Sequence, residues 1–123
     1  MNNEWYHVKQ IDKLDSPVLL VFPGRVKTNI QTAISMVANV RLLRPHVKTN
    51  KSPQATQLML DAGITKFKCC TIAEAEILGM NTAPGVLLAH QPLGPKLHRF
   101  IQLVKKFPFT KYSCLTDNIS AAQ

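Results

Sequence analysis

Short apolar segments alternate with amphipathic segments along this chain. Residues 18–22 read VLLVF, an apolar run with the length of a buried strand. After Pro23, apolar side chains recur with helical spacing on one face, at Val26, Ile30, Ala33, Ile34 and Val37. Residues 40–43, VRLL, form the next predicted strand. The N-terminal part of the chain therefore predicts a strand, a helix and a second strand.

A second helix and a third strand follow, with clear start and stop signals. Ser52 and Pro53 are an N-cap residue and a first-turn proline, a pair typical of a helix start. The apolar stripe behind them consists of Ala55, Leu58, Met59 and Ala62. Gly63 supplies the C-terminal stop. Residues 66–70, KFKCC, then predict a short strand.

The alternation continues to the C-terminus. Thr71 and Glu74 have the spacing of a capping box, which predicts a helix that runs to about Met80. Strands are predicted at 85–90 and 111–117, and the last residues could open another helix. Between these strands lies a helix that ends before Pro108. Its predicted apolar face consists of Leu97, Phe100, Ile101 and Val104.

This serial order of strands and helices predicts an α/β fold with a parallel sheet and helical crossovers. Two architectures are compatible with it, namely an open doubly wound sheet and the first part of a (β/α)8 barrel. A complete barrel needs about 250 residues, so the 123 residues of this chain supply at most about half of one. We expect a single unit over residues 1–123, without an internal linker.

The composition is that of a globular chain without a membrane segment. Apolar residues make up 46% of the chain, whereas disordered chains are much poorer in them. The longest apolar runs have about five residues, far below the roughly 20 that span a bilayer. The N-terminus lacks the apolar region of a signal peptide, and three cysteines make a poor disulfide framework. We expect a cytoplasmic protein with no membrane partner.

The formal net charge of +8 raises the question of a nucleic-acid partner. Phosphate binding needs lysines and arginines that cluster on one face. Here the basic residues are spread along the chain, and the aromatic residues do not interleave with them as base stacking requires. We expect no nucleic-acid partner, and we interpret the charge as a solvated surface or as that of a fragment whose acidic counterpart is missing.

A dense polar cluster, RPHVKTNKSP, occupies residues 44–53 directly after an apolar run. Strand side chains alternate between faces, so a strand that continues through Lys48 would place Leu42, Arg44, His46 and Lys48 on one face. Polar side chains near the carboxyl end of a barrel strand are typical of catalytic groups. Pro45 argues against a regular central strand, because it cannot donate to the ladder.

Lys48 is the candidate nucleophile of this cluster. Burial and a nearby cation such as Arg44 would disfavour its charged ammonium form. The neutral amine can then form a Schiff base with a carbonyl group. A solvated lysine at a strand end and a structural histidine at His46 are the alternative interpretations.

The segment LRPHVKTNKSP resembles the cofactor-lysine segment of the D-threonine aldolase and D-serine dehydratase family. These are alanine-racemase-like, fold-type III enzymes that use pyridoxal 5'-phosphate (PLP). Further segments resemble the family in the same order, namely LDSPVLLVFPGRVKTNI, AGITKFKCCTIAEAEIL, VLLAHQPLGPKLHRF and FPFTKYSCLTDN. Together they cover about residues 11 to 118.

The resemblance implies the N-terminal part of a PLP-binding barrel domain, from a lyase that acts on 3-hydroxy-D-amino acids and is a homodimer at full length. Lys48 would carry the cofactor as a Schiff base and exchange protons with the substrate α-carbon or its product. His46 and Gln91 would contact the cofactor or line its site. The family also uses a divalent metal, whose ligands lie in a C-terminal β domain that is absent here, so no residue of this chain is assigned to a metal.

Two departures from the family pattern limit the expected activity. The lysine motif usually reads KTHK, whereas Asn50 stands here in the histidine position and cannot titrate. The chain is also about a third of the family length, so we expect the isolated chain to be inactive. The strand at residues 18–22 would pair with the missing domain. A truncated non-enzymatic remnant, a subunit of a split protein and a small basic binding protein are the alternatives.

Two other groups of residues carry weaker signals. Cys69, Cys70 and Cys114 could bind a metal together with His90, but they lack CxxC spacing, and adjacent cysteines in a strand point to opposite faces. We interpret the cysteines as small core residues. We interpret Glu74 as a cap and Glu76 as part of a solvated helix face.

Overall fold

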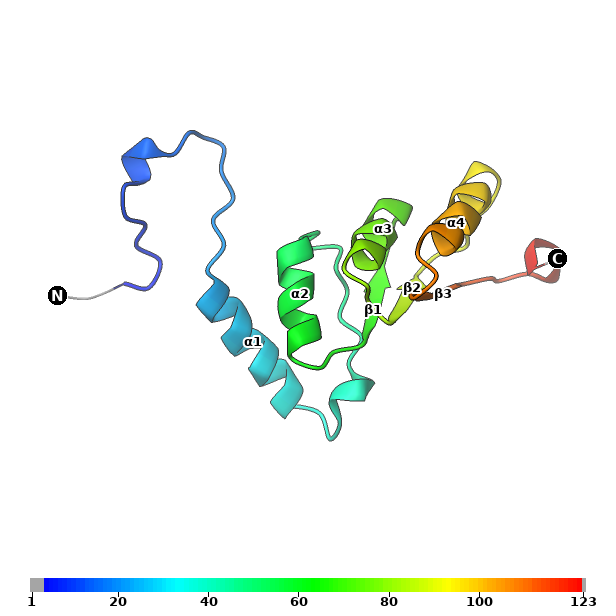
Figure 1. The fold of residues 1–123 in the computed structure, drawn as a ribbon, viewed down its shortest axis with the longest axis horizontal. Coiled ribbons are helices and arrows are strands. Elements are labelled where there is room, and N and C mark those ends of the chain that lie inside the picture. The colour runs from blue at the N-terminus through cyan, green and yellow to red at the C-terminus, as the bar shows by residue number, and fades with distance from the viewer. Residues whose placement is uncertain (1–3, 123) are drawn as a thin grey trace.

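The computed structural model describes residues 4–122 and has a mixed α/β fold (Figure 1). Its helices are α1 (Pro23–Ser35), α2 (Pro53–Asp61), α3 (Ile72–Met80), α4 (Pro95–Lys106) and the short α5 (Ile119–Ala122). Its strands are β1 (Lys66–Cys69), β2 (Gly85–Leu88) and β3 (Lys111–Cys114). Two 3-10 helices, η1 (Ile11–Lys13) and η2 (Val40–Leu42), complete the described elements.

The strands form a parallel sheet in the order β1-β2-β3. Phe67 pairs with Val86, and Val86 pairs with Tyr112, so these residues form one row across the sheet. The Tyr112 hydroxyl donates to the Ala75 carbonyl of α3 at 3.1 Å. The Tyr112 ring also meets Phe100 of α4, edge to face, with ring centroids 6.1 Å apart. Both crossover helices therefore pack on the same face of the sheet.

The hydrophobic core lies between this face and the helices. Its largest fully buried side chains are Phe67, Leu78, Leu88, Val47, Val86, Thr56 and Cys69. The opposite face of the sheet carries the alternate residues of each strand, which are Lys66, Lys68, Gly85, Leu87, Lys111 and Ser113. None of these alternate residues is fully buried. The sheet is thus covered by helices on one face only.

A short segment of the polar cluster extends the sheet beyond β1. The Val47 amide donates to the Lys68 carbonyl at 3.0 Å, and the Lys68 amide donates to the Pro45 carbonyl at 2.9 Å. His46 and Lys68 form the resulting parallel bridge. The Val47 side chain is 1% exposed, so it anchors the segment in the core.

The strand predicted at 40–43 is wrong, because Val40–Leu42 forms the 3-10 helix η2. The Asn39 side chain accepts a hydrogen bond from the Arg41 amide at 2.9 Å and starts this turn. Such local capping by asparagine competes with strand pairing. The chain becomes extended only afterwards, and the sheet contact begins at Pro45.

The strand predicted at residues 18–22 is also not formed. These residues are extended, but no ladder partner for them occurs among residues 4–122. Leu19 is 83% exposed, and Val18 and Val21 are more than half exposed. The apolar run lies along the arm that leads into α1 (Figure 1), where it packs against no strand.

The other helices and strands are confirmed, with bounds close to those predicted. Ser52 Oγ accepts from the Ala55 amide at 3.1 Å at the start of α2. Gly63 has a φ of 88° at the end of that helix, a conformation that favours glycine. Thr71 Oγ1 accepts from the Glu74 amide at 3.1 Å and caps α3.

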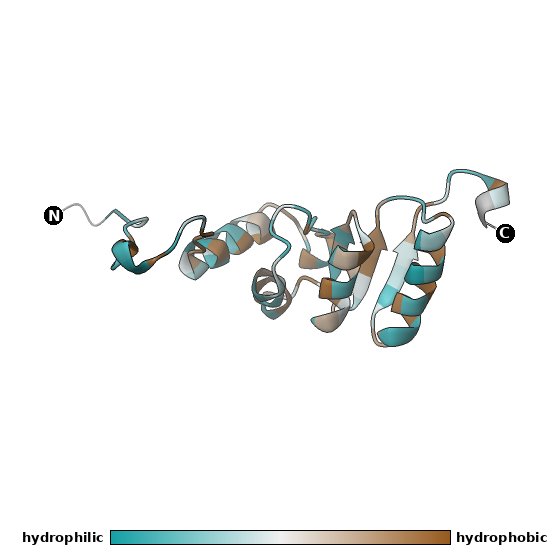
Figure 2. Cartoon of the chain, turned by 90° about the horizontal axis from the view of Figure 1, so that it is seen from above, coloured by the Kyte–Doolittle hydropathy of each residue, from teal (hydrophilic) through white to brown (hydrophobic). Residues whose placement is uncertain are grey.

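The face of α4 differs in part from the prediction. The structure buries Phe100 and Leu103, whereas Leu97, Ile101 and Val104 stay exposed. Hydrophilic and hydrophobic residues alternate along this helix in Figure 2. The sheet covers only one side of α4, so part of its apolar surface has no cover within the described residues. Within residues 4–122, none of the helices is both long enough and apolar enough to cross a membrane.

Gly79 marks the closest approach between α3 and the segment around β3. A Cβ atom at Gly79 would meet the Tyr112 hydroxyl and would lie 2.7 Å from a ring carbon of Phe107. Such distances are far shorter than ordinary van der Waals contact. By contrast, a Cβ at Gly24 in α1 would meet nothing within 4 Å. The two glycines therefore form a matched pair for a packing test.

We expect Gly79→Ala to lower the free energy of unfolding by about 1–3 kcal/mol, because the added methyl group overpacks the helix–sheet contact. Gly24→Ala should instead raise it by about 0.4–1 kcal/mol, because alanine restricts the unfolded chain. Urea unfolding of the two variants and the wild type measures both changes. Equal stability of Gly79→Ala and wild type would contradict this packing.

Candidate functional site

The carboxyl ends of the parallel strands bring the candidate residues to one edge of the sheet. Lys48 follows the bridge at His46, Cys70 follows β1, and Gln91 lies in the loop after β2. The Gln91 side-chain amide donates to Thr116 Oγ1, which follows β3, at 3.4 Å. This edge is where parallel α/β proteins place their ligand sites.

Lys48 lies in a turn directly after the bridge. The Lys51 amide donates to the Val47 carbonyl at 2.8 Å and closes this turn. Lys48 is exposed, so the expected burial of this lysine is not found in the structure. The strand ladder ends at His46, and the residues after it are free to turn toward solvent.

The expected common face of Leu42, Arg44, His46 and Lys48 is also not formed. Leu42 belongs to η2, where side chains do not alternate as in a strand. Leu42, Arg44 and Lys48 are all exposed, whereas His46 is half-buried. Alternation holds only across the bridge, where Val47 points into the core and His46 away from it.

His46 lies near two residues that follow β1 in the sequence, Cys70 and Glu74. One ring nitrogen of His46, the Cys70 sulfur and a Glu74 carboxylate oxygen lie within 4.8 Å of one another. The Nε2 atom of His46 is buried and has no hydrogen-bond partner among residues 4–122. An unpaired buried nitrogen is costly. This triad is a second group of chemically active side chains beside Lys48.

Glu74 contributes a buried carboxylate to this triad. Glu74 is 2% exposed, and its Oε2 atom accepts a hydrogen bond from the Cys70 amide at 2.8 Å. Its other oxygen, Oε1, lies 3.8 Å from the Lys51 ammonium. Buried carboxylates require such partners. Glu74 therefore joins the start of α3 to the polar cluster, a role beyond the predicted helix cap.

Cys69 and Cys70 have different surroundings, as their alternation predicts. Cys69 is buried on the helix-covered face, and its thiol donates to the Leu87 carbonyl at 3.5 Å. Burial raises the pKa of the Cys69 thiol to about 12, and the negative charges of Glu74 and Cys70 add to this effect. The interpretation as a core residue is confirmed for Cys69. Cys70 instead joins the triad, and Cys114 is exposed.

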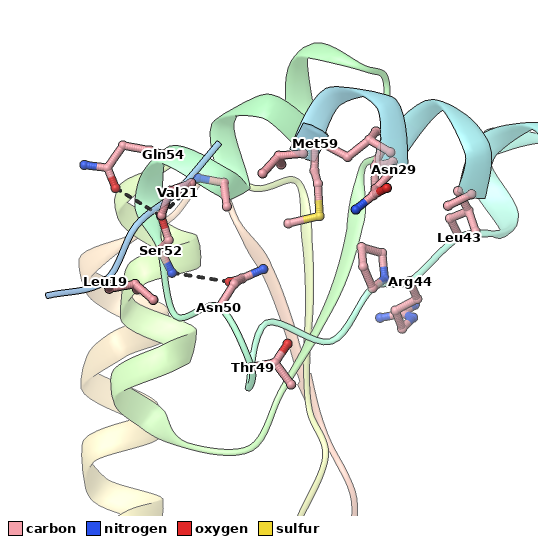
Figure 3. Close-up of a pocket in the computed structure, with 16 residues that line it drawn as sticks. Leu19, Val21, Asn29, Leu43, Arg44, Thr49, Asn50, Ser52, Gln54 and Met59 are labelled. Carbon is pink, nitrogen blue, oxygen red and sulfur yellow. Dashed lines mark hydrogen bonds between the residues drawn. The ribbon is translucent and has the colours of Figure 1, made fainter. Parts of the chain in front are cut away.

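A large cavity lies on the other side of the polar cluster. It is an apolar groove of about 780 Å³ between α1, α2 and the segment after η2 (Figure 3). Its polar lining consists of Asn29, Arg44, Thr49, Asn50, Ser52 and Gln54. Lys48 and His46 do not line it, so the polar cluster divides between this groove and the sheet edge.

Asn50, the departure from the family motif, has a structural role here. Its side-chain oxygen accepts from the Ser52 amide at 3.3 Å, as the dashed line in Figure 3 marks. This bond closes the turn just before Ser52 caps α2. Asparagine commonly makes such turns with its own backbone two residues later.

A smaller basic cavity lies next to the triad. It has a volume of about 330 Å³. Its lining consists of Cys70, Thr71 and the first residues of α3, together with His90, Lys96 and Arg99. The Nε2 atom of His90 is buried and has no partner among residues 4–122. His90 is not part of the triad, so the grouping of the three cysteines with His90, which the sequence did not favour, is not formed among residues 4–122.

The residues at this edge fit one end of a PLP group. PLP attaches to proteins through a lysine amine, and the exposed Lys48 amine is accessible at the sheet edge. His46 offers a ring nitrogen that has no partner. The Gln91 side-chain amide donates instead to Thr116, which follows the neighbouring strand β3.

This chain was compared with known protein families and with curated proteins. No family model matches it, and no curated protein matches it either.

We expect the free energy of unfolding to fall as the pH rises from 9 to about 12. The Cys69 thiol has an ordinary pKa of 9.0 and a raised pKa of about 12 in the folded chain. The Tyr112 pKa rises from 10.0 to about 12, mainly through burial. The unfolded chain thus loses these protons first, and alkaline pH favours it.

Urea unfolding across this pH range measures the loss of stability. Cys69→Ala should show a shallower loss than the wild type, whatever its stability at neutral pH. Cys114→Ala, which removes an exposed thiol, should keep the wild-type slope. A Cys69→Ala slope equal to that of the wild type would show that Cys69 ionises without a burial penalty.

Proposed function

We propose that this chain is the N-terminal portion of a PLP-dependent D-amino-acid lyase of the D-threonine aldolase or D-serine dehydratase type. Its substrates would be 3-hydroxy-D-amino acids. The observation that carries the proposal is the position of Lys48, two residues after the parallel bridge of His46 with Lys68. In that position the motif lysine lies at the carboxyl edge of a parallel sheet, where barrel enzymes hold their catalytic groups.

The one-sided helix layer supports a barrel over a doubly wound sheet. A doubly wound sheet needs helices on both faces, whereas α3 and α4 both contact Tyr112 on one face. In a barrel the opposite face points inward. The residues of that face include Lys68 and Leu87, which are only partly exposed. The chain would then supply consecutive βα units of a (β/α)8 domain.

The residues of the site have separate roles in this proposal. PLP, when bound, supplies an electron sink for the bonds at the substrate α-carbon. Lys48 holds the cofactor through its amine and moves a proton at that carbon. His46 donates or accepts through its unpaired ring nitrogen. Gln91 lines the edge of the site through the loop that its bond to Thr116 holds in place.

The surfaces of the chain favour a role as part of a larger assembly. Leu97, Ile101 and Val104 of α4 are exposed, and the groove beside α1 is mostly apolar. Exposed apolar surface of this kind is typical of contacts with other protein segments. We propose a homodimer in the complete enzyme, with the cytoplasm as its compartment. A subunit of a split protein is the second candidate, and the same exposed surfaces favour it.

Reductive labelling of the chain with PLP tests the role of Lys48. The chain is incubated with PLP and reduced with borohydride, and peptide mass spectrometry locates the label. We expect a several-fold higher extent of labelling at Lys48 than at Lys66. Lys66 is a suitable internal control, because it is also exposed but lies at the amino end of β1.

Lys48→Ala should remove the preferred label and leave that on Lys66 unchanged. The same variant should lose any absorbance band that PLP gains on binding. Equal labelling of Lys48 and Lys66 would contradict the proposal. It would favour the remaining alternative, a small basic protein that is unrelated to PLP.

A further inference from the structure

We propose that His46, Cys70 and Glu74 form a binding site for Zn²⁺. Their ligand atoms lie within 4.8 Å of one another. They come from three different segments, which are the bridge beside β1, the residue after β1 and the first turn of α3. The fold, rather than a local sequence motif, brings them together.

The donor set suits zinc better than other common metals. Imidazole nitrogen, thiolate sulfur and carboxylate oxygen are the three ligand types of zinc sites. Calcium and magnesium prefer oxygen ligands alone. At tetrahedral zinc, neighbouring ligand atoms are about 3.3–3.8 Å apart, given metal–ligand distances of about 2.0–2.3 Å. The triad therefore needs to contract by about 1 Å, which side-chain rotation can supply.

The burial of the triad also points to a cation. Glu74 is 2% exposed and carries a negative charge. Nε2 of His46 is buried without a partner in residues 4–122. A metal ion between these two groups would neutralise the Glu74 carboxylate and would form a bond with the His46 nitrogen. Lys51 is a described cation near Glu74, at 3.8 Å, whereas Nε2 of His46 has no described partner.

Binding would exchange a proton for the metal. The Cys70 thiol releases its proton to solvent as the sulfur bonds to zinc. The two negative charges of the Cys70 thiolate and the Glu74 carboxylate then balance the charge of Zn²⁺. With three protein ligands, the fourth position stays open for a water molecule or a ligand oxygen, as in catalytic zinc sites.

The Lys51 ammonium would compete with the metal ion for the Glu74 carboxylate. This ammonium lies 3.8 Å from Glu74 Oε1, and the Lys51 side chain is 61% exposed. The long side chain can therefore swing into solvent when a metal binds. Removal of its charge should strengthen metal binding, because like charges near Glu74 repel each other.

The zinc site does not need PLP, although zinc would occupy the His46 ring nitrogen that the proposed function offers to the cofactor. Zinc would bind beside the turn that carries Lys48, whatever Lys48 does. The resemblance places the family's metal ligands outside this chain, so the triad is a different site. Metal binding and PLP labelling can thus succeed or fail independently.

Titration of the purified chain with Co²⁺, a spectroscopic substitute for zinc, tests the site. We expect a thiolate-to-cobalt charge-transfer band that saturates at one metal per chain and disappears when Zn²⁺ is added. Cys70→Ser should abolish the band, whereas Cys114→Ser should keep it. Cys114 is the matched control, because it is a free thiol outside the triad.

Substitution of His46, Glu74 or Lys51 should change the affinity for Zn²⁺ in a different way at each position. His46→Gln and Glu74→Gln should each weaken Zn²⁺ binding by at least about tenfold, as competition with a chromophoric chelator measures. Lys51→Gln should tighten it. His98→Gln is the histidine control, because His98 is exposed on α4, and it should leave the affinity unchanged.

Alkylation of the wild-type chain keeps the test independent of variants that fail to fold. Zn²⁺ should protect Cys70 from iodoacetamide and leave Cys114 reactive, as peptide mass spectrometry shows. The proposal is overturned if the wild-type chain gives no thiolate–cobalt band, if the band survives Cys70→Ser, or if Zn²⁺ leaves Cys70 as reactive as before.

Discussion

The parallel bridge between residues 45–47 and Lys68 is the contact on which the rest of the site depends. Two backbone hydrogen bonds of 3.0 and 2.9 Å hold it, and the buried Val47 side chain anchors it in the core. Each such bond adds only about 1 kcal/mol net. The burial of Val47 adds about 1.5–3 kcal/mol. Without the bridge, the polar cluster would be a loop with no fixed relation to β1.

The bridge also decides which side chains meet. It sets His46 beside Cys70 and leads the chain directly into the turn that exposes Lys48. Lys51 at the end of that turn reaches the buried Glu74 at 3.8 Å. Glu74 in turn accepts from the Cys70 amide. One short strand contact therefore links the motif to α3 through charge as well as through packing.

Much of the secondary structure could be predicted from local signals. Ser52 with Pro53 and Thr71 with Glu74 mark helix starts by chemistry that acts within four residues. The short apolar runs that alternate with these helices predict the three strands. Residues 40–43 have the same apolar pattern. Val40–Leu42 nevertheless forms a 3-10 helix, because the Asn39 side chain accepts a hydrogen bond from the Arg41 amide at its start. Residues 18–22 need a partner strand, which their own sequence cannot supply. The triad could not be predicted, because the register of His46 against Lys68 brings its members together and no spacing along the chain encodes it.

Amide hydrogen exchange tests the central claim most directly. If the bridge holds the polar cluster on the sheet, the amides of Val47 and Lys68 should exchange about as slowly as those of the central strand β2, because both donate across the bridge. Exchange of the Val47 amide at the rate of an unstructured peptide would contradict the account. In that case neither Lys48 nor the triad would have a fixed place at the edge of the sheet.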